Sequence, residues 1–314
     1  MVAADAELLT FTRCNNEIDR IVNIVLERAA AGSNIALGFD LDKTLMYSKK
    51  QAGLKQVAPD AYIAPWLKKV FQSLNSMVDP VSHKRNTLCF TVTGRSTDFA
   101  AENLGLFGSG QFHSEATDVF EGDHKIIKSR WNVDAIRPLI TWAVQGIDGY
   151  IENDEGVLLD KSHHICVMTN NDNMGEYIHK MQAIAHAYNT ILGDSKEAIE
   201  KHIYLEYGED YAEFGPKPTC KGRVIQEITQ QYREFFENCF LVYFGDTPEK
   251  DGPAIDTVQN MGGMGIAVGA KKFDDYCSGH ICVPSPKEVY TIIQKVHDGL
   301  AHLNADRGLV NFNT

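Results

Sequence analysis

The sequence predicts an α/β protein in which a parallel sheet, covered by helices on both faces, is interrupted by an inserted α+β domain. Three observations support this fold class. Short apolar runs alternate with helical periodicities at both ends of the chain, as expected for right-handed crossovers between parallel strands. Three of the apolar runs end at polar residues, where open α/β sheets place their ligands. The middle of the chain carries more polar segments that favour paired strands.

The first half of the predicted core opens with a helix. Apolar residues recur at helical spacing from Ala6 to Ala31, and Gly32-Ser33-Asn34 ends the periodicity. Ile35-Ala36-Leu37-Gly38-Phe39 is a continuous apolar run, which is typical of a strand buried on both faces. Three further elements are expected: a helix at residues 65–77, a strand at 87–92 and a helix at 99–104.

The second half of the core repeats this alternation near the end of the chain. Its predicted elements are a helix from near 219, a strand at 239–244, a helix at 252–260, strands at 264–268 and 280–283, and a helix at 287–303. The tail at 304–314 is expected to be a loose end.

The intervening block is expected to form a separate domain. It contains candidate strands at 149–153, 157–159, 163–169, 202–207 and 211–214, and candidate helices at 133–144 and 174–192. An α+β block between two halves of a parallel sheet is best explained as an insertion. We therefore predict a core formed by residues 1–122 and 217–314, and an inserted cap formed by residues 123–216.

Composition narrows the class of protein. A length of 314 residues suits two average domains, and a net charge of −12 argues against a general affinity for nucleic acid or an anionic membrane. The N-terminus lacks the pattern of a signal peptide, and no apolar run approaches the ~18 residues of a membrane span. The seven cysteines form no CxxC pair, which favours reduced thiols. We expect a cytoplasmic protein and, in the absence of an assembly motif, a monomer.

Asp40 and Asp42 follow the first buried strand directly, in the segment Asp40-Leu41-Asp42-Lys43-Thr44. Phosphoryl transfer needs an in-line nucleophile, a cation and a proton donor for the leaving group. A carboxylate at a strand end can attack phosphorus, and a second one two residues later can act as general acid and then activate water. Asp40 is therefore the candidate nucleophile, forming an aspartyl-phosphate, and Asp42 the candidate acid/base. Thr44 could steady the loop through its hydroxyl; the alternative is an acidic loop without chemistry.

Two further segments supply groups that would contact a phosphate. Thr93-Gly94-Arg95 ends the second strand, where a hydroxyl and backbone N–H groups beside a glycine can bind phosphate and Arg95 adds positive charge. Lys221 opens a predicted helix, where a cation is unfavourable unless a phosphate or a carboxylate lies beside it. The alternatives are a common turn after a strand and a solvated surface lysine.

Asp246 and Asp251 follow the longest apolar strand, in a Gly-Asp-x-x-x-x-Asp segment. We expect Asp246 and Asp40 to converge on one Mg²⁺, a hard cation that prefers carboxylates and waters. Asp42 and Asp251 complete the candidate metal site, and Asp251 could also hold Lys221 in position. The alternative is that one of these acids caps a helix.

The order of these segments resembles the four motifs of the haloacid dehalogenase superfamily. The matching residues are Asp40-Leu41-Asp42-Lys43-Thr44, Thr93-Gly94-Arg95, Lys221, and Gly245 to Asp251. The resemblance covers nearly the whole chain. It implies a Rossmann-like core, Mg²⁺ as cofactor, Asp40 as nucleophile and Asp42 as acid/base.

Within that superfamily the chain looks most like the trehalose-6-phosphate phosphatase branch, whose α+β cap lies between the second and third motifs. The similar segments are Ser114 to Phe120, Tyr150 to Gly156, and Ala212 to Pro216. Because cap glutamates of that branch contact sugar hydroxyls, the resemblance makes Glu152 and Glu213 candidate substrate contacts. The other candidate substrate contacts are Thr44, Gly94 and Arg95. An exposed acidic strand face is the alternative for the two glutamates.

The sequence also departs from the pattern of that branch. Lys43 stands where glycine is usual, and Thr247 and Lys250 replace acids. In the cap, Asp154 and Glu155 replace a lysine, with one residue inserted. We therefore carry over the chemistry of the family and leave the sugar open.

The expected function is Mg²⁺-dependent hydrolysis of a phosphosugar in carbohydrate metabolism, first of all trehalose 6-phosphate to trehalose and phosphate in trehalose biosynthesis. Two alternatives keep the fold: a phosphatase of another phosphosugar, such as sucrose phosphate or mannosyl-3-phosphoglycerate, and a phosphomutase. A third alternative is a catalytically silent module that binds a phosphosugar. The retention of both aspartates, the lysine and the metal-site acids argues against that third alternative.

Overall fold

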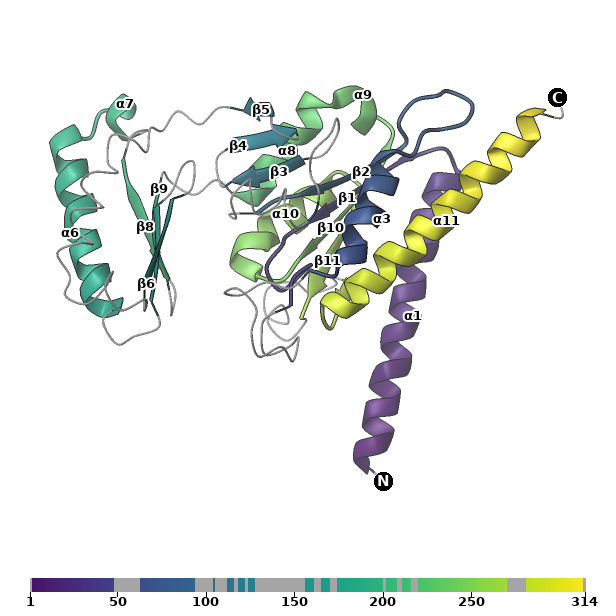
Figure 1. The fold of residues 1–314 in the computed structure, drawn as a ribbon, viewed down its shortest axis with the longest axis horizontal. Helices are drawn as coiled ribbons and strands as arrows, with labels where there is room; N and C mark the ends of the chain where they lie inside the picture. The colour runs from purple at the N-terminus through teal and green to yellow at the C-terminus, as the bar shows by residue number, and fades with distance from the viewer. Residues whose placement is uncertain are drawn as a thin grey trace. The chain divides into compact units, whose positions relative to one another are not determined.

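A computed structural model gives the three-dimensional structure of the chain (Figure 1). The residues that it describes are 2–47, 63–93, 104, 112–115, 118–121, 124–127, 156–160, 165–169, 174–199, 202–207, 211–215, 220–269 and 281–312. Internal contacts divide the chain into two compact units, Met1–Ile126 with Cys220–Thr314, and Ile127–Thr219. The insertion predicted at residues 123–216 overlaps the second unit, and its boundaries stay a prediction.

The first unit is built around an eight-stranded sheet with the strand order β12-β11-β10-β1-β2-β3-β4-β5. Neighbouring strands from β12 to β3 are parallel, whereas β3 and β4 form an antiparallel pair. The strands are β1 (Asn34–Phe39), β2 (Thr87–Thr91), β3 (Phe112–Glu115), β4 (Asp118–Glu121), β5 (His124–Ile127), β10 (Cys239–Gly245), β11 (Met264–Val268) and β12 (Ile281–Val283). The predicted parallel α/β sheet is confirmed, and β5 is a strand that the sequence did not indicate.

β1 lies inside the sheet, between β10 and β2, because its residues from Ile35 to Phe39 are apolar and all buried. Gly38 has Phe90 on one side and Tyr243 on the other at the same register. A Cβ atom at Gly38 would lie 2.7 Å from Phe90 Cζ and 3.1 Å from Tyr243 Cδ2. Glycine at this position therefore leaves room for two large rings on one face of the sheet.

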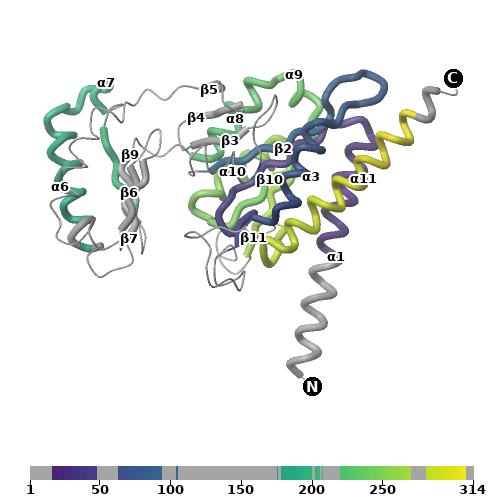
Figure 2. Tube along the Cα trace, viewed as in Figure 1, coloured from purple at the N-terminus to yellow at the C-terminus, as the bar shows by residue number. Residues whose placement is uncertain are grey.

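Helices cover both faces of this sheet (Figures 1 and 2). On one face, α11 (Pro286–Phe312) contacts both α1 (Val2–Ala30) and α3 (Pro65–Asn75), and α3 packs on β2. On the other face, α8 (Lys221–Gln231) packs against α10 (Pro248–Asn260), which contacts β10 and β11; the short α9 (Arg233–Phe236) precedes β10. On the face covered by α3, the centre of the Phe39 ring lies 5.0 Å from that of Phe244 and 5.3 Å from that of Phe71.

The C-terminal tail differs from the prediction, because α11 continues through residues 304–312 instead of ending near 303. Asn304 Oδ1 accepts a hydrogen bond of 3.0 Å from Asn86 Nδ2. Arg307 donates to the carbonyl oxygens of Ala29 and Ala30 at the end of α1, at 2.6 and 3.0 Å. These contacts join residues more than 200 positions apart, so local sequence gave no sign of them.

The second unit contains a four-stranded antiparallel sheet with the order β6-β7-β9-β8. Its elements are β6 (Gly156–Asp160), β7 (Ile165–Thr169), α6 (Met174–Leu192), α7 (Lys196–Ile199), β8 (Tyr204–Tyr207) and β9 (Tyr211–Gly215). α6 contacts β8 and β9, which confirms the predicted α+β character and the predicted helix at 174–192. The candidate strand at 149–153 and the helices at 133–144 and 99–104, apart from helical Leu104, lie outside the described residues.

Among the described helices, none combines the length and the apolarity that a bilayer crossing requires.

Candidate active site

Three polar side chains emerge together at the carboxyl edge of the first unit's sheet. β1 is in register with β2 and β10 up to its last residue, so the residues that follow these strands lie at one edge. They are Asp40 after β1, Thr93 after β2 and Asp246 after β10, and each is less than a tenth exposed. The edge at which the sequence places its candidate catalytic residues is therefore the edge where the structure gathers them.

The loop after Asp40 is held mainly by its own backbone. The carbonyl oxygen of Leu41 accepts hydrogen bonds from the N–H groups of Thr44, Leu45 and Met46, at 3.3, 3.0 and 2.9 Å. Tyr290 of α11 adds a hydroxyl that donates to the Leu45 carbonyl oxygen at 2.5 Å. Thr44 Oγ1 is buried and makes no hydrogen bond to the described residues. No contact of this hydroxyl with the described residues supports the suggestion that it steadies the loop, and its roles in the loop and as a substrate contact stay predictions.

Lys221 stands at the N-terminus of α8 and reaches back to Asp40. Its Nζ lies 2.5 Å from Asp40 Oδ1 and 2.7 Å from Asp251 Oδ1, and its side chain is 15% exposed. The next residue, Gly222, lets α8 approach α10 closely, because a Cβ atom there would lie 2.4 Å from the carbonyl oxygen of Pro253. The alternative of a solvated surface lysine is excluded by these contacts.

Asp251, in the first turn of α10, is completely buried and accepts four hydrogen bonds. Oδ1 accepts from Lys221 Nζ at 2.7 Å and from the Tyr243 hydroxyl at 2.9 Å. Oδ2 accepts from the backbone N–H groups of Asp246 and Thr247, at 3.1 and 3.0 Å. The carboxylate therefore ties the loop after β10 to the start of α8. The sequence did not point to Tyr243, because a tyrosine within an apolar strand looks like an ordinary packing residue.

The site holds more negative than positive charge. Burial raises the pKa of Asp40 well above its usual range, and Lys221 opposes this shift without cancelling it. Three neighbouring carboxylates reinforce the shift: Asp251, Asp42 and Asp246. Burial lowers the pKa of Lys221, but Asp40 and Asp251 outweigh it, so the net shift is upward and the ammonium stays protonated. The shift of Asp40 thus comes first from burial and then from its carboxylate neighbours, whereas the shift of Lys221 comes from its two carboxylate partners.

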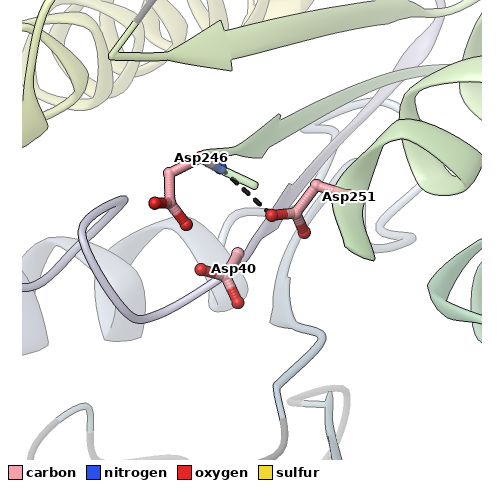
Figure 3. Close-up of side chains that lie close together, drawn as sticks. All are labelled: Asp40, Asp246 and Asp251. Carbon is pink, nitrogen blue, oxygen red and sulfur yellow. Dashed lines mark hydrogen bonds between the residues drawn. The ribbon is translucent and has the colours of Figure 1, made fainter. Parts of the chain in front are cut away.

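A hard divalent cation fits this charge excess. Asp40, Asp246 and Asp251 place carboxylate oxygens within 4.8 Å of one another, and Figure 3 shows the three groups converging. A donor set made only of carboxylate oxygens suits ions such as Mg²⁺, Mn²⁺ or Ca²⁺. Asp42 is not in this group, and its part in the metal site stays a prediction.

The remaining candidate residues are less well defined by the structure. Gly94, Arg95 and Glu152 lie outside the described residues. Glu213 lies in β9, where its backbone pairs with Cys166 of β7 and with β8, and its role as a sugar contact stays a prediction.

Comparison with known proteins finds likeness in structure and none in sequence. No family model and no curated protein matches the sequence. The C-terminal domain of trehalose-6-phosphate phosphatase from Candida albicans matches with a TM-score of 0.56 at 13% identity, over 89% of this chain and 96% of that one.

Two further solved structures match comparably well. A haloacid dehalogenase-like hydrolase from Bacteroides thetaiotaomicron has a TM-score of 0.54 at 15% identity, over 84% of this chain and 99% of that one. The C-terminal domain of the trehalose synthase regulatory protein of Candida albicans has a TM-score of 0.54 at 10% identity, over 87% and 97%. In fold, the chain is thus a Rossmann-like α/β protein that is similar to solved structures of a trehalose-6-phosphate phosphatase and a haloacid dehalogenase-like hydrolase.

Proposed function

We propose that the chain is a metal-dependent phosphatase that transfers the phosphoryl group of a phosphosugar to Asp40. The observation that carries the proposal is the buried cluster at the carboxyl edge, where Lys221 holds Asp40 among further carboxylates. A carboxylate presented next to a protonated lysine, with room in the charge balance for a divalent cation, is equipped to attack a phosphate dianion.

The first step forms a covalent intermediate. An oxygen of Asp40 bonds to phosphorus while the bond from phosphorus to the sugar oxygen breaks. Asp42, two residues along the loop, gives its proton to the departing sugar oxygen, which leaves as a hydroxyl. In the second step Asp42 takes a proton from water as the water oxygen attacks phosphorus, so that phosphate leaves and the Asp40 carboxylate is restored.

The other residues of the cluster hold and balance these groups. Lys221 keeps Asp40 in place and offsets the charge of the phosphoryl oxygens. A divalent cation, when bound, would add further positive charge at those oxygens. Asp40 and Asp246 would hold it, since both oxygens of Asp251 already accept hydrogen bonds. Thr44, whose buried hydroxyl makes no hydrogen bond to the described residues, is the candidate donor to the phosphate.

Trehalose 6-phosphate is the substrate we propose first, with Mg²⁺ as the metal. The structural likeness to the Candida albicans trehalose-6-phosphate phosphatase supports this choice. Arg95, Glu152 and Glu213 are the residues we propose for recognition of the sugar phosphate, with Gly94. Sucrose phosphate and mannosyl-3-phosphoglycerate are the next candidates, because Asp154 and Glu155 replace a lysine of the cap.

The likeness to a trehalose synthase regulatory protein favours one further possibility, a module that binds a phosphosugar without turning it over. Such a module does not need a nucleophile, an acid and a lysine together. Asp40, Asp42 and Lys221 are all present here, so we place catalysis first.

Release of inorganic phosphate with Mg²⁺ tests the proposal. The panel comprises trehalose 6-phosphate, sucrose 6-phosphate, mannosyl-3-phosphoglycerate, glucose 6-phosphate and an aryl phosphate, with EDTA and Asp40→Asn as controls. We expect turnover of a phosphosugar that both controls abolish. Isomerisation of a sugar phosphate without net phosphate release would instead identify a phosphomutase. Calorimetric binding of a panel member without any turnover would replace the enzyme by a binding module.

A further inference from the structure

The hydroxyl of Tyr243 is a buried polar group that the proposed mechanism does not use. Tyr243 lies within β10, is fully enclosed, and donates to Asp251 Oδ1 at 2.9 Å. Because no part of its surface is exposed, the hydroxyl does not reach a substrate. A group of this kind acts on the site through the residue that it contacts.

That residue, Asp251, is the point where three parts of the site meet. Its Oδ1 receives Lys221, whose ammonium also contacts Asp40, and its Oδ2 receives the backbone N–H of Asp246. A rotation of this carboxylate would therefore move the partner of the nucleophile and the strand end that carries a candidate metal ligand. Besides Lys221, the Tyr243 hydroxyl donates to Oδ1, and it does so from a strand of the sheet.

Two glycines make this contact possible. A Cβ atom at Gly38 would lie 3.1 Å from Tyr243 Cδ2, so glycine lets the tyrosine ring lie against β1. A Cβ atom at Gly245 would lie 2.4 Å from Asp251 Cβ and 2.5 Å from its Cγ, so only glycine lets the carboxylate approach the end of β10. The local sequence is thus adapted to bring a tyrosine hydroxyl and a buried carboxylate together.

We propose that Tyr243 is a positioning residue of the phosphoryl-transfer site, whose hydroxyl fixes Asp251 and, through it, the placement of Lys221 against Asp40. The proposal rests on the proposed function. It extends that function by assigning a role to a residue that contacts neither substrate nor metal. Groups that orient the residues around a metal are worth about 10–100-fold in metal affinity or activity when they are removed.

The test compares Tyr243→Phe with Ile293→Val. The first variant removes one hydroxyl and keeps the ring, and the second trims the fully buried Ile293 of α11, a helix that packs against α1 and α3. Both are expected to lower the unfolding temperature slightly. The comparison uses Mn²⁺ affinity measured by electron paramagnetic resonance, and kcat and KM for the best substrate at saturating Mg²⁺. Asp246→Asn serves as the variant with a damaged metal site.

We expect Tyr243→Phe to weaken Mn²⁺ binding and to lower kcat, each by about tenfold, with KM nearly unchanged. Ile293→Val should leave all three at the wild-type values. Equal Mn²⁺ affinity and equal kcat in the two variants would overturn the proposal, since Tyr243 would then contribute to packing alone.

The two proposals fail in different ways. If the wild-type protein binds Mn²⁺ but hydrolyses no phosphate ester, the proposed function fails. The positioning role is then still decided by the Mn²⁺ affinities of the two variants. If the wild-type protein hydrolyses its substrate and Tyr243→Phe does so equally well with unchanged Mn²⁺ affinity, the positioning role alone fails.

Discussion

The two edges of the sheet in the first unit differ in the sign of their charged side chains and in how far these are buried. At the carboxyl edge, the buried Asp40 and Asp251 both contact Lys221, which is 15% exposed, at 2.5 and 2.7 Å. At the amino edge, where β1 and β2 begin, a hollow of about 700 Å³ is lined in part by four cationic side chains. They are Lys84, Arg85, Arg233 and Arg307.

Two of these four cations pair with carboxylates of the protein, and neither pair is buried. Arg307 pairs with Asp79 at 3.4 Å and also donates to two carbonyl oxygens of α1. Arg233 pairs with Glu237 at 3.1 Å, with side chains 81% and 63% exposed. An exposed ion pair of this kind contributes about 0–1 kcal/mol to stability.

The difference between the edges shows what distinguishes a reactive site from a structural one in this fold. The hollow at the amino edge is lined by cations, of which Arg233 and Arg307 already pair with carboxylates of the protein. At the carboxyl edge, Asp40, Asp246 and Asp251 are buried, and Lys221 pairs with two of them. Among the described residues, this leaves an excess of negative charge. Uncompensated buried charge is costly unless a ligand completes it. We therefore assign the proposed chemistry to the carboxyl edge and not to the hollow at the amino edge.

Asp40→Asn should have the largest effect, because it removes the nucleophile. Phosphate release should fall to background. The raised pKa of Asp40 means that, in the metal-free fold, its ionised form destabilises the protein at any pH above the pKa that Asp40 has in the unfolded chain. The variant lacks this cost, so in EDTA at pH 7 it should unfold at a higher temperature than the wild type. A lower unfolding temperature would show that the contact with Lys221 outweighs the cost of burial.

Lys221→Met should be the most destabilising change at the carboxyl edge. It leaves Asp40 and Asp251 buried without their cation, and removal of one partner of a buried pair costs about 3–5 kcal/mol. The matched change at the amino edge, Lys84→Met, should stay within about 0.5 kcal/mol, because Lys84 is exposed. Urea unfolding of both variants in EDTA measures the contrast. Equal losses would remove the distinction between the two edges.

Gly245→Ala should disturb the carboxyl edge through sterics alone. The new Cβ atom would lie 2.5 Å from Asp251 Cγ, and overpacking of a tight site costs about 1–3 kcal/mol. Gly175→Ala in α6 is the control, since its Cβ atom meets nothing within 4 Å and alanine favours a helix. We expect opposite signs in thermal unfolding, with activity lost only in Gly245→Ala. Full activity of that variant would mean that Asp251 need not hold its present position.

Asp79→Asn should have the smallest effect. The pKa of Asp79 is lowered mainly by the hydrogen bond from the backbone N–H of Ser82. The Ser82 hydroxyl, the backbone N–H of Val81 and the charge of Arg307 lower it further. A lowered pKa adds stability that is present above the unfolded value of about 4 and is lost as pH falls through the folded value. The variant should lose about 1 kcal/mol at pH 7 and nothing at acid pH below the folded pKa. Its phosphatase activity should equal that of the wild type, and a loss of activity would connect the amino edge to the chemistry.

Much of the fold and of the carboxyl edge was predictable because the signals are local. An apolar run that stops at an aspartate marks a strand end, and parallel strands bring such ends together. Lys221 was indicated by a local anomaly, a cation at a helix N-terminus, and the structure supplies the carboxylates Asp40 and Asp251 that explain it.

What escaped prediction depends on contacts between distant parts of the chain. Tyr243 occupies an apolar position in a strand. Its hydroxyl meets Asp251 only because α10 folds back on β10, a contact that the local sequence does not specify. The helical residues 304–312 look like a polar tail, and Arg307 is ordered by the end of α1. Hydroxyl contacts such as the one assigned to Thr44 depend on side-chain direction, which a motif does not specify.

Trapping the phosphorylated enzyme tests the central claim most directly. Asp42→Asn should still be phosphorylated by 4-nitrophenyl phosphate, whose leaving group needs no proton donor, but should lose the base that activates water. Borohydride reduction converts an aspartyl-phosphate to homoserine, which peptide mass spectrometry can locate. We predict homoserine at position 40 in Asp42→Asn and none in the double variant with Asp40→Asn. Modification of another residue, or no modification although the wild-type protein turns the substrate over, would contradict the assignment of Asp40 as nucleophile.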